Sequence, residues 1–226
     1  MKLLALETAT EACSAALWVD GQVLARFQHA PRLQTELMLP MVDDLLAEAG
    51  LRLNDLDAIA YSRGPGAFTG VRIAAAVAQG LAFGVDLPII PVSSLQTLAQ
   101  GVYREFGASQ VLCVFDARMD EVYVGAYQLL GEDRLMQPLM PERLGAAATV
   151  QLPEEGAYFG AGNGLVYLPV LAPRIHLTHT EAKLFPQAQD LAVLAVPELK
   201  AGRAMAPELA LPVYLRDEVW QKLPGR

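Results

Sequence analysis

The sequence predicts an α/β protein of two related halves, each containing a mixed sheet, with the second half reduced. Short apolar runs bounded by turn residues alternate with longer helical patterns, which is typical of sheets covered by helices. The order of elements in residues 1–106 is partly repeated in residues 107–226. With 226 residues, 53% of them apolar, the chain can bury the core that this architecture needs.

The first half is expected to begin with three strands and to continue as alternating helices and strands. KLLALE reads as a strand, and ACSAALWVDGQVLARFQ reads as a hairpin that turns at Asp20-Gly21. Pro40 leaves the start of the first helix open, because proline removes a backbone donor. The remaining elements are a helix from about Thr35 to Ala49, the strand DAIAYS, the loop RGPGAFTG, a helix over 68–83, the strand PIIPV and a helix from about Ser93 to Phe106.

The second half restarts with QVLCVFDARMDEVYVGAYQL, which reads as strand, turn and strand. A third strand is expected near Leu135, followed by a helix at PERLGAAA. GAYFGAGNG then predicts a strand with a glycine-rich turn, and PQAQDLAVLAVPELKAG predicts a helix. We therefore expect domains at 1–106 and 107–226, with a C-terminal segment that can pack back on the first domain.

This order is that of the ribonuclease H-like fold, as duplicated in actin, sugar kinases and Hsp70 chaperones. In active members of that superfamily an acid at the end of the first strand handles metal and phosphate, and glycine-rich turns close over ATP. A vestigial nucleotide cleft would therefore use Glu7 with Gly160, Gly162 and Gly164. The first hairpin, however, offers no glycine for close approach of a phosphate.

The loop RGPGAFTG and its helix suggest a nucleotide loop at first sight. A dinucleotide fingerprint would need glycine where Thr69 stands, and no Gly-Lys-Ser/Thr follows for a phosphate loop. The helix instead repeats small residues every four positions, which lets another helix come close. We expect this ridge to face water in the monomer and a partner helix in a complex; its members are Gly70, Ala74, Ala78 and Ala82. The alternative is that the same chain covers it.

The helix over 35–49 has two apolar stripes, and one of them contains methionines that suit a surface able to repack. Two stripes imply two packing partners. The residues expected at a partner interface are Leu37, Met38, Met41, Leu45, Phe68, Gly70, Val71, Ala74, Ala78 and Leu81.

Charge and composition narrow the function classes. A net charge of −8 without a basic stripe argues against a chain that holds RNA alone. Cys13 and Cys113 read as buried thiols, and the spacing of His176 and His179 does not suit a metal site. No catalytic or metal-binding residue and no cofactor is expected. The absence of a signal-peptide pattern and of a long apolar run favours the cytoplasm and argues against a membrane protein.

The acidic segment DARMDE admits two interpretations. Asp116, Asp120 and Glu121, together with Glu7, could form the carboxylate cluster of a nuclease of the ribonuclease H type. We favour local hydrogen bonds that set a tight turn between two strands.

Several segments together resemble the bacterial TsaB (YeaZ) family, which takes part in N6-threonylcarbamoylation of adenosine 37 in tRNA. They are LLALETAT, AYSRGPGAFTGVRIAAAVAQGLAF, PVSSLQTLA, FDARMDEVY and LPVYLR, and the GPGxFTGxR segment is the most specific. Ala67 stands where the family usually has serine. The segments run from the first strand to the C-terminus.

The resemblance implies a noncatalytic partner of the catalytic subunit TsaD, whose metal-binding HxxxH motif this sequence lacks. It implies that the chain stabilises TsaD through the helices near 35–49 and 68–83, pairs with itself when TsaD is absent, and meets tRNA only through the complex. The ATPase TsaE is expected to dock on the pair. An active enzyme of the actin-like superfamily, an ATP-dependent transferase or a peptidase, remains the alternative.

Overall fold

The structure, a computed structural model, describes residues 1–215 and contains two mixed sheets. The first sheet has the order β3-β2-β1-β4-β5. Its strands are β1 (Lys2–Glu7), β2 (Ala12–Val19), β3 (Gln22–His29), β4 (Ala58–Gly64) and β5 (Ile89–Ser93), and its helices are α1 (Gln34–Ala49), α2 (Phe68–Gly84) and the connecting α3 (Ser94–Phe106). The three-strand start and the helices of the first half are as predicted, including the turn at Asp20-Gly21.

The second sheet has the order β11-β10-β6-β7-β8, with β9 also paired to β7. Its strands are β6 (Gln110–Arg118), β7 (Glu121–Leu130), β8 (Leu135–Pro138), β9 (Arg143–Ala146), β10 (Tyr158–Ala161) and β11 (Leu177–Glu181), followed by α5 (Ala188–Lys200); α4 (Leu168–Leu171) lies between β10 and β11. The helix predicted at PERLGAAA is wrong. Its central residues form β9, because β7 is long enough to pair with β8 at one end and with β9 at the other.

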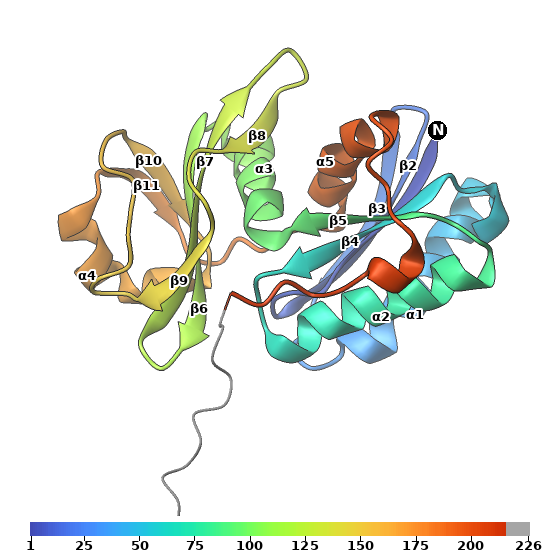
Figure 1. The fold of residues 1–226 in the computed structure, drawn as a ribbon, viewed down its shortest axis with the longest axis horizontal. Helices are drawn as coiled ribbons and strands as arrows, with labels where there is room; N and C mark the ends of the chain where they lie inside the picture. The colour runs from blue at the N-terminus through green and yellow to red at the C-terminus, as the bar shows by residue number, and fades with distance from the viewer. Residues whose placement is uncertain (216–226) are drawn as a thin grey trace, which may run out of the picture.

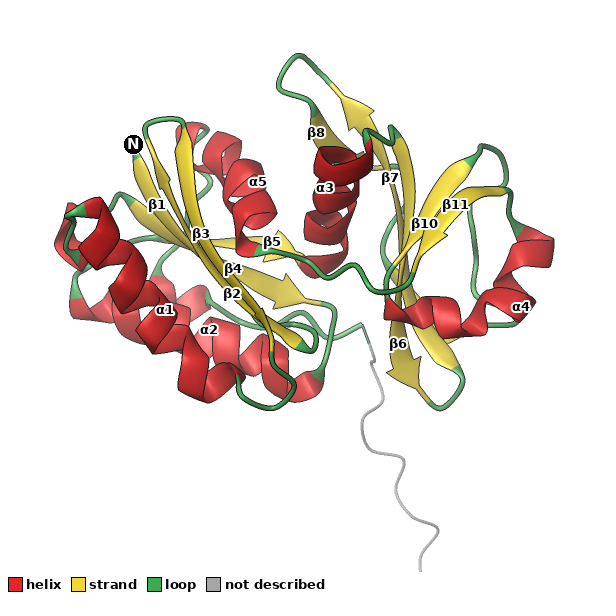
Figure 2. Cartoon of the chain, turned by 180° about the vertical axis from the view of Figure 1, so that it is seen from behind, coloured by secondary structure: helices red, strands yellow, loops and turns green. Residues whose placement is uncertain are grey.

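Helices cover both faces of the first sheet (Figures 1 and 2). Side chains of β1 alternate between two cores: Leu4 and Leu6 contact α1 and α2, whereas Leu3 and Ala5 contact α5. The sheet is therefore buried on both sides, as its continuous apolar strands require. α5 follows the second sheet in sequence but packs on the first sheet. This agrees with the expectation that a C-terminal segment can pack back on the first domain. The division at 106/107 remains our proposal for the domains.

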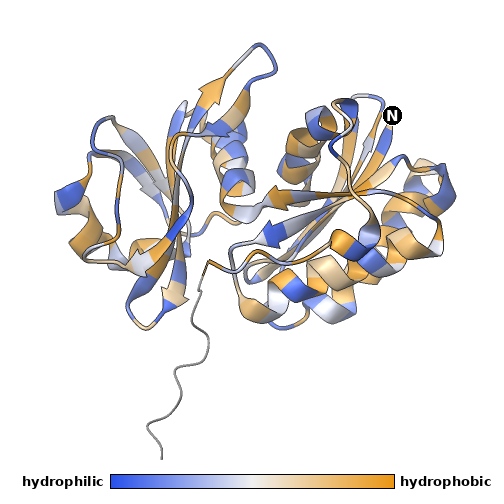
Figure 3. Cartoon of the chain, viewed as in Figure 1, coloured by the Kyte–Doolittle hydropathy of each residue, from blue (hydrophilic) through white to orange (hydrophobic). Residues whose placement is uncertain are grey.

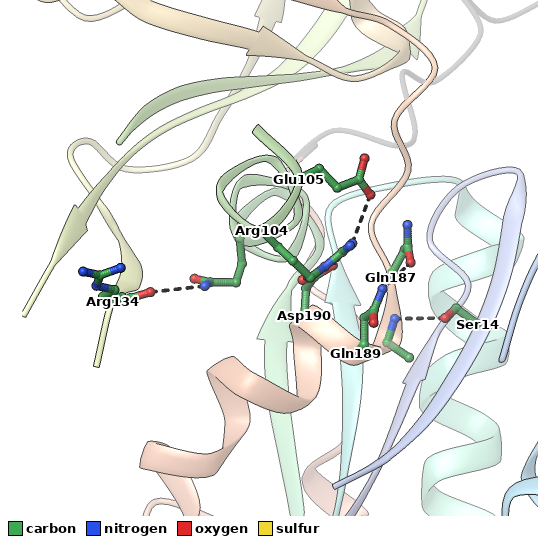
Figure 4. A network of polar contacts seen from close by, with 9 residues as sticks. Ser14, Arg104, Glu105, Arg134, Gln187, Gln189 and Asp190 are labelled. Atoms are coloured by element: carbon green, nitrogen blue, oxygen red, sulfur yellow. Dashed lines mark hydrogen bonds and ion pairs between the residues drawn. The ribbon is translucent and has the colours of Figure 1, made fainter. Parts of the chain in front are cut away.

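α3 and α5 lie side by side between the two sheets. Arg104 on α3 makes a two-pronged ion pair with Asp190 on α5, with Nε–Oδ1 and Nη2–Oδ2 distances of 2.8 and 3.0 Å (Figure 4). The Asp190 side chain is only 3% exposed, whereas Arg104 is 37% exposed, so the carboxylate is buried at the contact beside a half-buried guanidinium. Ser14 on β2 accepts a hydrogen bond from the Ala188 N–H at the start of α5. These contacts join the two halves of the chain.

Figure 3 shows hydrophobic stretches on α1 and α2 as well as on the sheets. Within residues 1–215, no helix combines the length and the apolar character needed to cross a membrane.

Candidate partner surface and central cavity

The glycines of the GPG loop allow close packing against the loop that follows β1. A Cβ atom at Gly70 would lie 2.0 Å from the Thr8 carbonyl oxygen, and one at Gly66 would lie 2.4 Å from that of Ala9. Two hydrogen bonds fix the contact: Ala67 N–H donates to the Ala9 carbonyl at 2.7 Å, and Thr8 Oγ1 donates to the Gly70 carbonyl at 2.7 Å. Backbone-to-backbone contact therefore accounts for these glycines.

The small-residue ridge of α2 does not face water. Gly70, Ala74, Ala78 and Ala82 are buried within the monomer, and the three alanines belong to the core under the first sheet. The expected orientation of α2 is therefore wrong, and a charged residue at position 78 would test folding rather than pairing. The error arises because α2 is apolar on most of its circumference, so its pattern does not identify the side that meets the sheet.

The methionine stripe of α1 is also mostly inside. Met38 and Leu45 are fully buried and Met41 is nearly so, which places them in the same core. Val71 on α2 is buried too, while Leu37 and Leu81 are half-buried. Of the ten residues expected at a partner interface, Phe68 alone is exposed, at 63%. These stripes pack α1 and α2 onto the sheet.

A different set of apolar and small residues lies on the outer side of α1 and α2. Phe83 is 57% exposed and Leu39 is 48% exposed. Ala76, Gly80 and Gly84 are exposed at four-residue spacing, and a Cβ at either glycine would contact nothing within 4 Å. With half-buried Ile73 and Val77 the exposed residues of α2 share one side of that helix by their three- and four-residue spacing; we call this side the outer face, namely Ile73, Ala76, Val77, Gly80, Phe83 and Gly84. This face is open to a second helix.

Residues 205–214, which we call the strap, run along another side of α2 (Figure 1). Gln79 donates to the Pro207 carbonyl at 3.0 Å, and Tyr61 Oη donates to the Leu211 carbonyl at 3.2 Å. The Arg72 guanidinium lies over the rings of Phe68 and Tyr214, 3.2 and 4.8 Å from their centroids. Cation–π contacts and hydrogen bonds thus hold the strap on α2 and leave the outer face uncovered.

A cavity of about 1430 Å³ lies between the start of α2 and the β6–β7 hairpin. Asn163 crosses it, because its Nδ2 donates to both oxygens of Glu11 at 3.3 Å while its Oδ1 accepts from Asp116 N–H at 3.0 Å. Polar lining residues include Thr10, Glu11, Arg32, Asp116, Arg118 and Asn163. The cavity is therefore a cleft with a mixed apolar and polar lining, and a hydrogen-bonded bridge through Asn163 links its two sides.

The residues expected in a vestigial nucleotide cleft lie behind this lining. Cβ atoms at Gly162 and Gly164 would lie 2.4 Å from the Val114 carbonyl oxygen and 2.6 Å from Val114 Cγ1, so this turn packs tightly on β6. Gly160 is buried in β10. Glu7 is 1% exposed at the end of β1. Of this turn, only Asn163, which lies between Gly162 and Gly164, lines the cleft.

Burial dominates the chemistry of Glu7. Its Oε1 accepts from Ala9 N–H at 2.6 Å, whereas Oε2 has no hydrogen-bond partner within residues 1–215. Loss of hydration raises the pKa of this carboxyl to about 8, against the hydrogen bonds from Ala9, Ser62 and Thr8 that lower it. The group is therefore mostly protonated at neutral pH, which does not suit an acid that holds a metal ion.

The acidic segment DARMDE forms a turn stabilised by its own hydrogen bonds, which confirms the interpretation favoured above. Asp116 accepts from Arg118 N–H at 2.8 Å and from its Nη1 at 3.0 Å. The His179 ring packs against Phe159 in a tilted arrangement, with ring centroids 4.8 Å apart and an interplanar angle of 46°. Within the described part of the chain, no three His, Cys, Asp or Glu residues are grouped as metal ligands would be.

Comparison with known proteins assigns the chain to a family. TsaB of Escherichia coli (strain K12), named a tRNA threonylcarbamoyladenosine biosynthesis protein, is 44% identical over the full length of both chains. The chain belongs to the TsaB family. TsaB of Haemophilus influenzae is 40% identical over 100% of this chain and 98% of its own.

Structural comparison agrees with this assignment. YeaZ from Pseudomonas aeruginosa superposes with a TM-score of 0.90 at 47% identity, over 95% of this chain and 99% of its own. A second structure from that organism, with the same score and coverage, is described as an uncharacterized protein with similarity to peptidase YeaZ. Residues 28–168 match the family model for TsaD, tRNA N6-adenosine threonylcarbamoyltransferase. The TsaB chain thus has the duplicated ribonuclease H-like fold that its element order predicted.

Two features were not located from the sequence: the path of the strap on α2 and the role of Glu142. The strap includes LPVY at residues 211–214, and its alternation of apolar residues with proline was a visible signal of an extended segment on the surface. Glu142, at the junction of the two sheets, carried no signal, because a single Glu after proline is typical of exposed loops.

Proposed function

We propose that this chain is a noncatalytic subunit in the synthesis of N6-threonylcarbamoyladenosine at position 37 of tRNA, and that it pairs with a TsaD-like catalytic subunit and stabilises it. The observation that carries the proposal is the outer face, which stays exposed after the sheet and the strap have covered the rest of α2. Exposed small residues beside large apolar ones suit close helix packing. Family membership supports the pathway.

The TsaD model matches a segment that contains both α1 and α2. Related chains carry related helices, so the same face can accept a TsaD-like subunit or a second copy of this chain. We therefore propose a homodimer when the chain is alone and a heterodimer when the catalytic subunit is present. A TsaE-like ATPase would dock on the assembled pair in the cytoplasm, and tRNA would be bound only through the complex.

An active enzyme is the second candidate, and the central cavity is the observation that favours it. Both acidic residues that line this cavity, however, already accept hydrogen bonds from neighbouring side chains: Glu11 from Asn163, and Asp116 from Arg118. These contacts favour a structural role for the two carboxylates over a catalytic one. ATP or peptide turnover by the purified chain alone would favour the enzyme over the noncatalytic subunit.

Ala76→Glu tests the outer face, because Ala76 is exposed and a charge there is hydrated in the monomer. In a close helix contact the same charge is desolvated without a partner, which costs several kcal/mol. Since about 1.4 kcal/mol is tenfold in affinity, we expect pairing to weaken by roughly 100-fold or more. Calorimetric titration with a TsaD-like subunit and light scattering of the chain alone measure the two pairings.

Ala148→Glu is the matched control, since Ala148 is exposed in the second half. It should pair as the unsubstituted chain does. Circular dichroism should show both variants folded. Undiminished pairing of Ala76→Glu would place the interface elsewhere.

A further inference from the structure

Glu142 lies immediately before β9 in the second half, yet its carboxylate contacts residues of the first half. Glu142 Oε1 accepts a hydrogen bond from Ser93 Oγ and one from Tyr127 Oη, the latter at 2.7 Å. Its Oε2 lies 4.0 Å from Nη2 of Arg63. The side chain is 13% exposed. One carboxylate therefore joins β4, the β5–α3 junction, β7 and the segment before β9.

The donors to Glu142 are held in place by their own surroundings. Ser93 ends β5 and caps α3, since its Oγ accepts from Gln96 N–H at 3.2 Å. Tyr127 is 1% exposed, and a Cβ at Gly125 would lie 2.8 Å from the Tyr127 hydroxyl oxygen. Glycine at 125 therefore gives the ring room to lie along β7 and reach Glu142. A negative group at the start of α3 is also favoured by the helix dipole.

Arg63 links this cluster to the partner surface. Its carbonyl accepts from Val213 N–H of the strap at 2.8 Å. Gly64 and Pro65 follow it and lead into α2, and the strap lies on α2. A path thus runs from the second sheet through the 4.0 Å ion pair of Glu142 with Arg63, and through the Arg63 backbone, to the start of α2.

We propose that Glu142 is a positioning residue that fixes the second sheet against the first and, through Arg63, fixes the GPG loop and the strap. The orientation of the outer face then depends on the second half of the chain, although that half contributes no residue to it. The consequence for pairing rests on the proposed function, whereas the coupling is a property of the chain by itself.

Hydrogen–deuterium exchange of the full chain tests the coupling. In Glu142→Ala we expect amides in residues 61–70 and 207–214 to exchange at least about tenfold faster, with α5 unchanged. Tyr127→Phe removes one donor and leaves the carboxylate in place, so it should raise exchange in the same two segments by less. Leu152→Ala, a buried residue of the second half, is the control for a general loss of stability and should leave both segments unchanged.

Faster exchange confined to residues 139–147, or equal effects of Glu142→Ala and Leu152→Ala on residues 61–70, would overturn the proposal. If Glu142→Ala does not fold, the proposal is tested by whether Tyr127→Phe exchanges faster in residues 61–70 and 207–214 than the unsubstituted chain. This test is independent of the proposed function. If the unsubstituted chain fails to bind a TsaD-like subunit, the proposed function is wrong, but the coupling between Glu142 and α2 still stands or falls on the exchange rates.

Discussion

Glu7 is a carboxyl group that is only 1% exposed at the end of β1, next to the loop that contacts the start of α2. Gly70 and Ala67 are hydrogen-bonded to the neighbouring Thr8 and Ala9, so ionisation of Glu7 would act on the contact that holds the start of α2. Protonation of Glu7 at neutral pH is therefore linked to folding.

Stability should fall with pH because of Glu7. Its folded pKa of about 8 lies above the ordinary 4.5, so between these values the folded chain binds a proton that the unfolded chain has released. The stabilisation is complete below pH 4.5 and is lost as pH rises through 8. Relative to Glu7→Gln, the unsubstituted chain should lose a few kcal/mol between pH 5 and 8, at about 1.4 kcal/mol per unit.

Urea denaturation at several pH values measures this difference. Glu132→Gln, at an exposed position, is the control and should follow the unsubstituted chain. Parallel pH profiles for Glu7→Gln and the unsubstituted chain would show that Glu7 is ionised in the folded state.

At the scale of elements, α2 has glycines with opposite surroundings. Gly70 touches the backbone of the loop after β1, whereas Gly80 is open to solvent. Gly70→Ala should destabilise the fold by several kcal/mol, because its Cβ overlaps the Thr8 carbonyl and backbone has little room to move. Gly80→Ala should stabilise the monomer by about 0.5–1 kcal/mol, because alanine restricts the unfolded chain.

Gly80→Ala should also weaken pairing if a partner helix packs on the outer face. Thermal denaturation gives the stabilities of both variants, and titration with a TsaD-like subunit gives the affinity. A Gly70→Ala variant as stable as the unsubstituted chain would contradict the packing described for the GPG loop.

The elements also show what could be predicted from the sequence. The first hairpin and the strand–helix alternation follow from local signals such as Asp20-Gly21 and the Ser93 cap, so they were predictable. PERLGAAA has helical propensity, yet pairing with β7 overrides it. Which side of α2 faces the sheet was not predictable. Ala76 and Ala78 are the same residue type, and only packing against the sheet makes Ala78 buried and Ala76 exposed.

At the scale of the whole molecule, the Arg104–Asp190 pair holds α3 against α5. Arg104→Ala should destabilise the chain by about 3 kcal/mol, because it leaves the Asp190 carboxylate buried without its partner. Arg203→Ala breaks a similar two-pronged pair with Glu198 at the surface and should cost about 1 kcal/mol or less. Urea denaturation compares the two variants, and equal losses would mean that Asp190 is hydrated in solution.

The position of α5 has a consequence for synthesis on the ribosome. The residues of β1, β2, β4 and β5 emerge early, but the helix that covers one side of their sheet ends at Lys200. A nascent chain therefore displays an apolar sheet surface until translation has passed residue 200. We expect the newly made first half to depend on chaperones, and to fold only once α5 has left the exit tunnel.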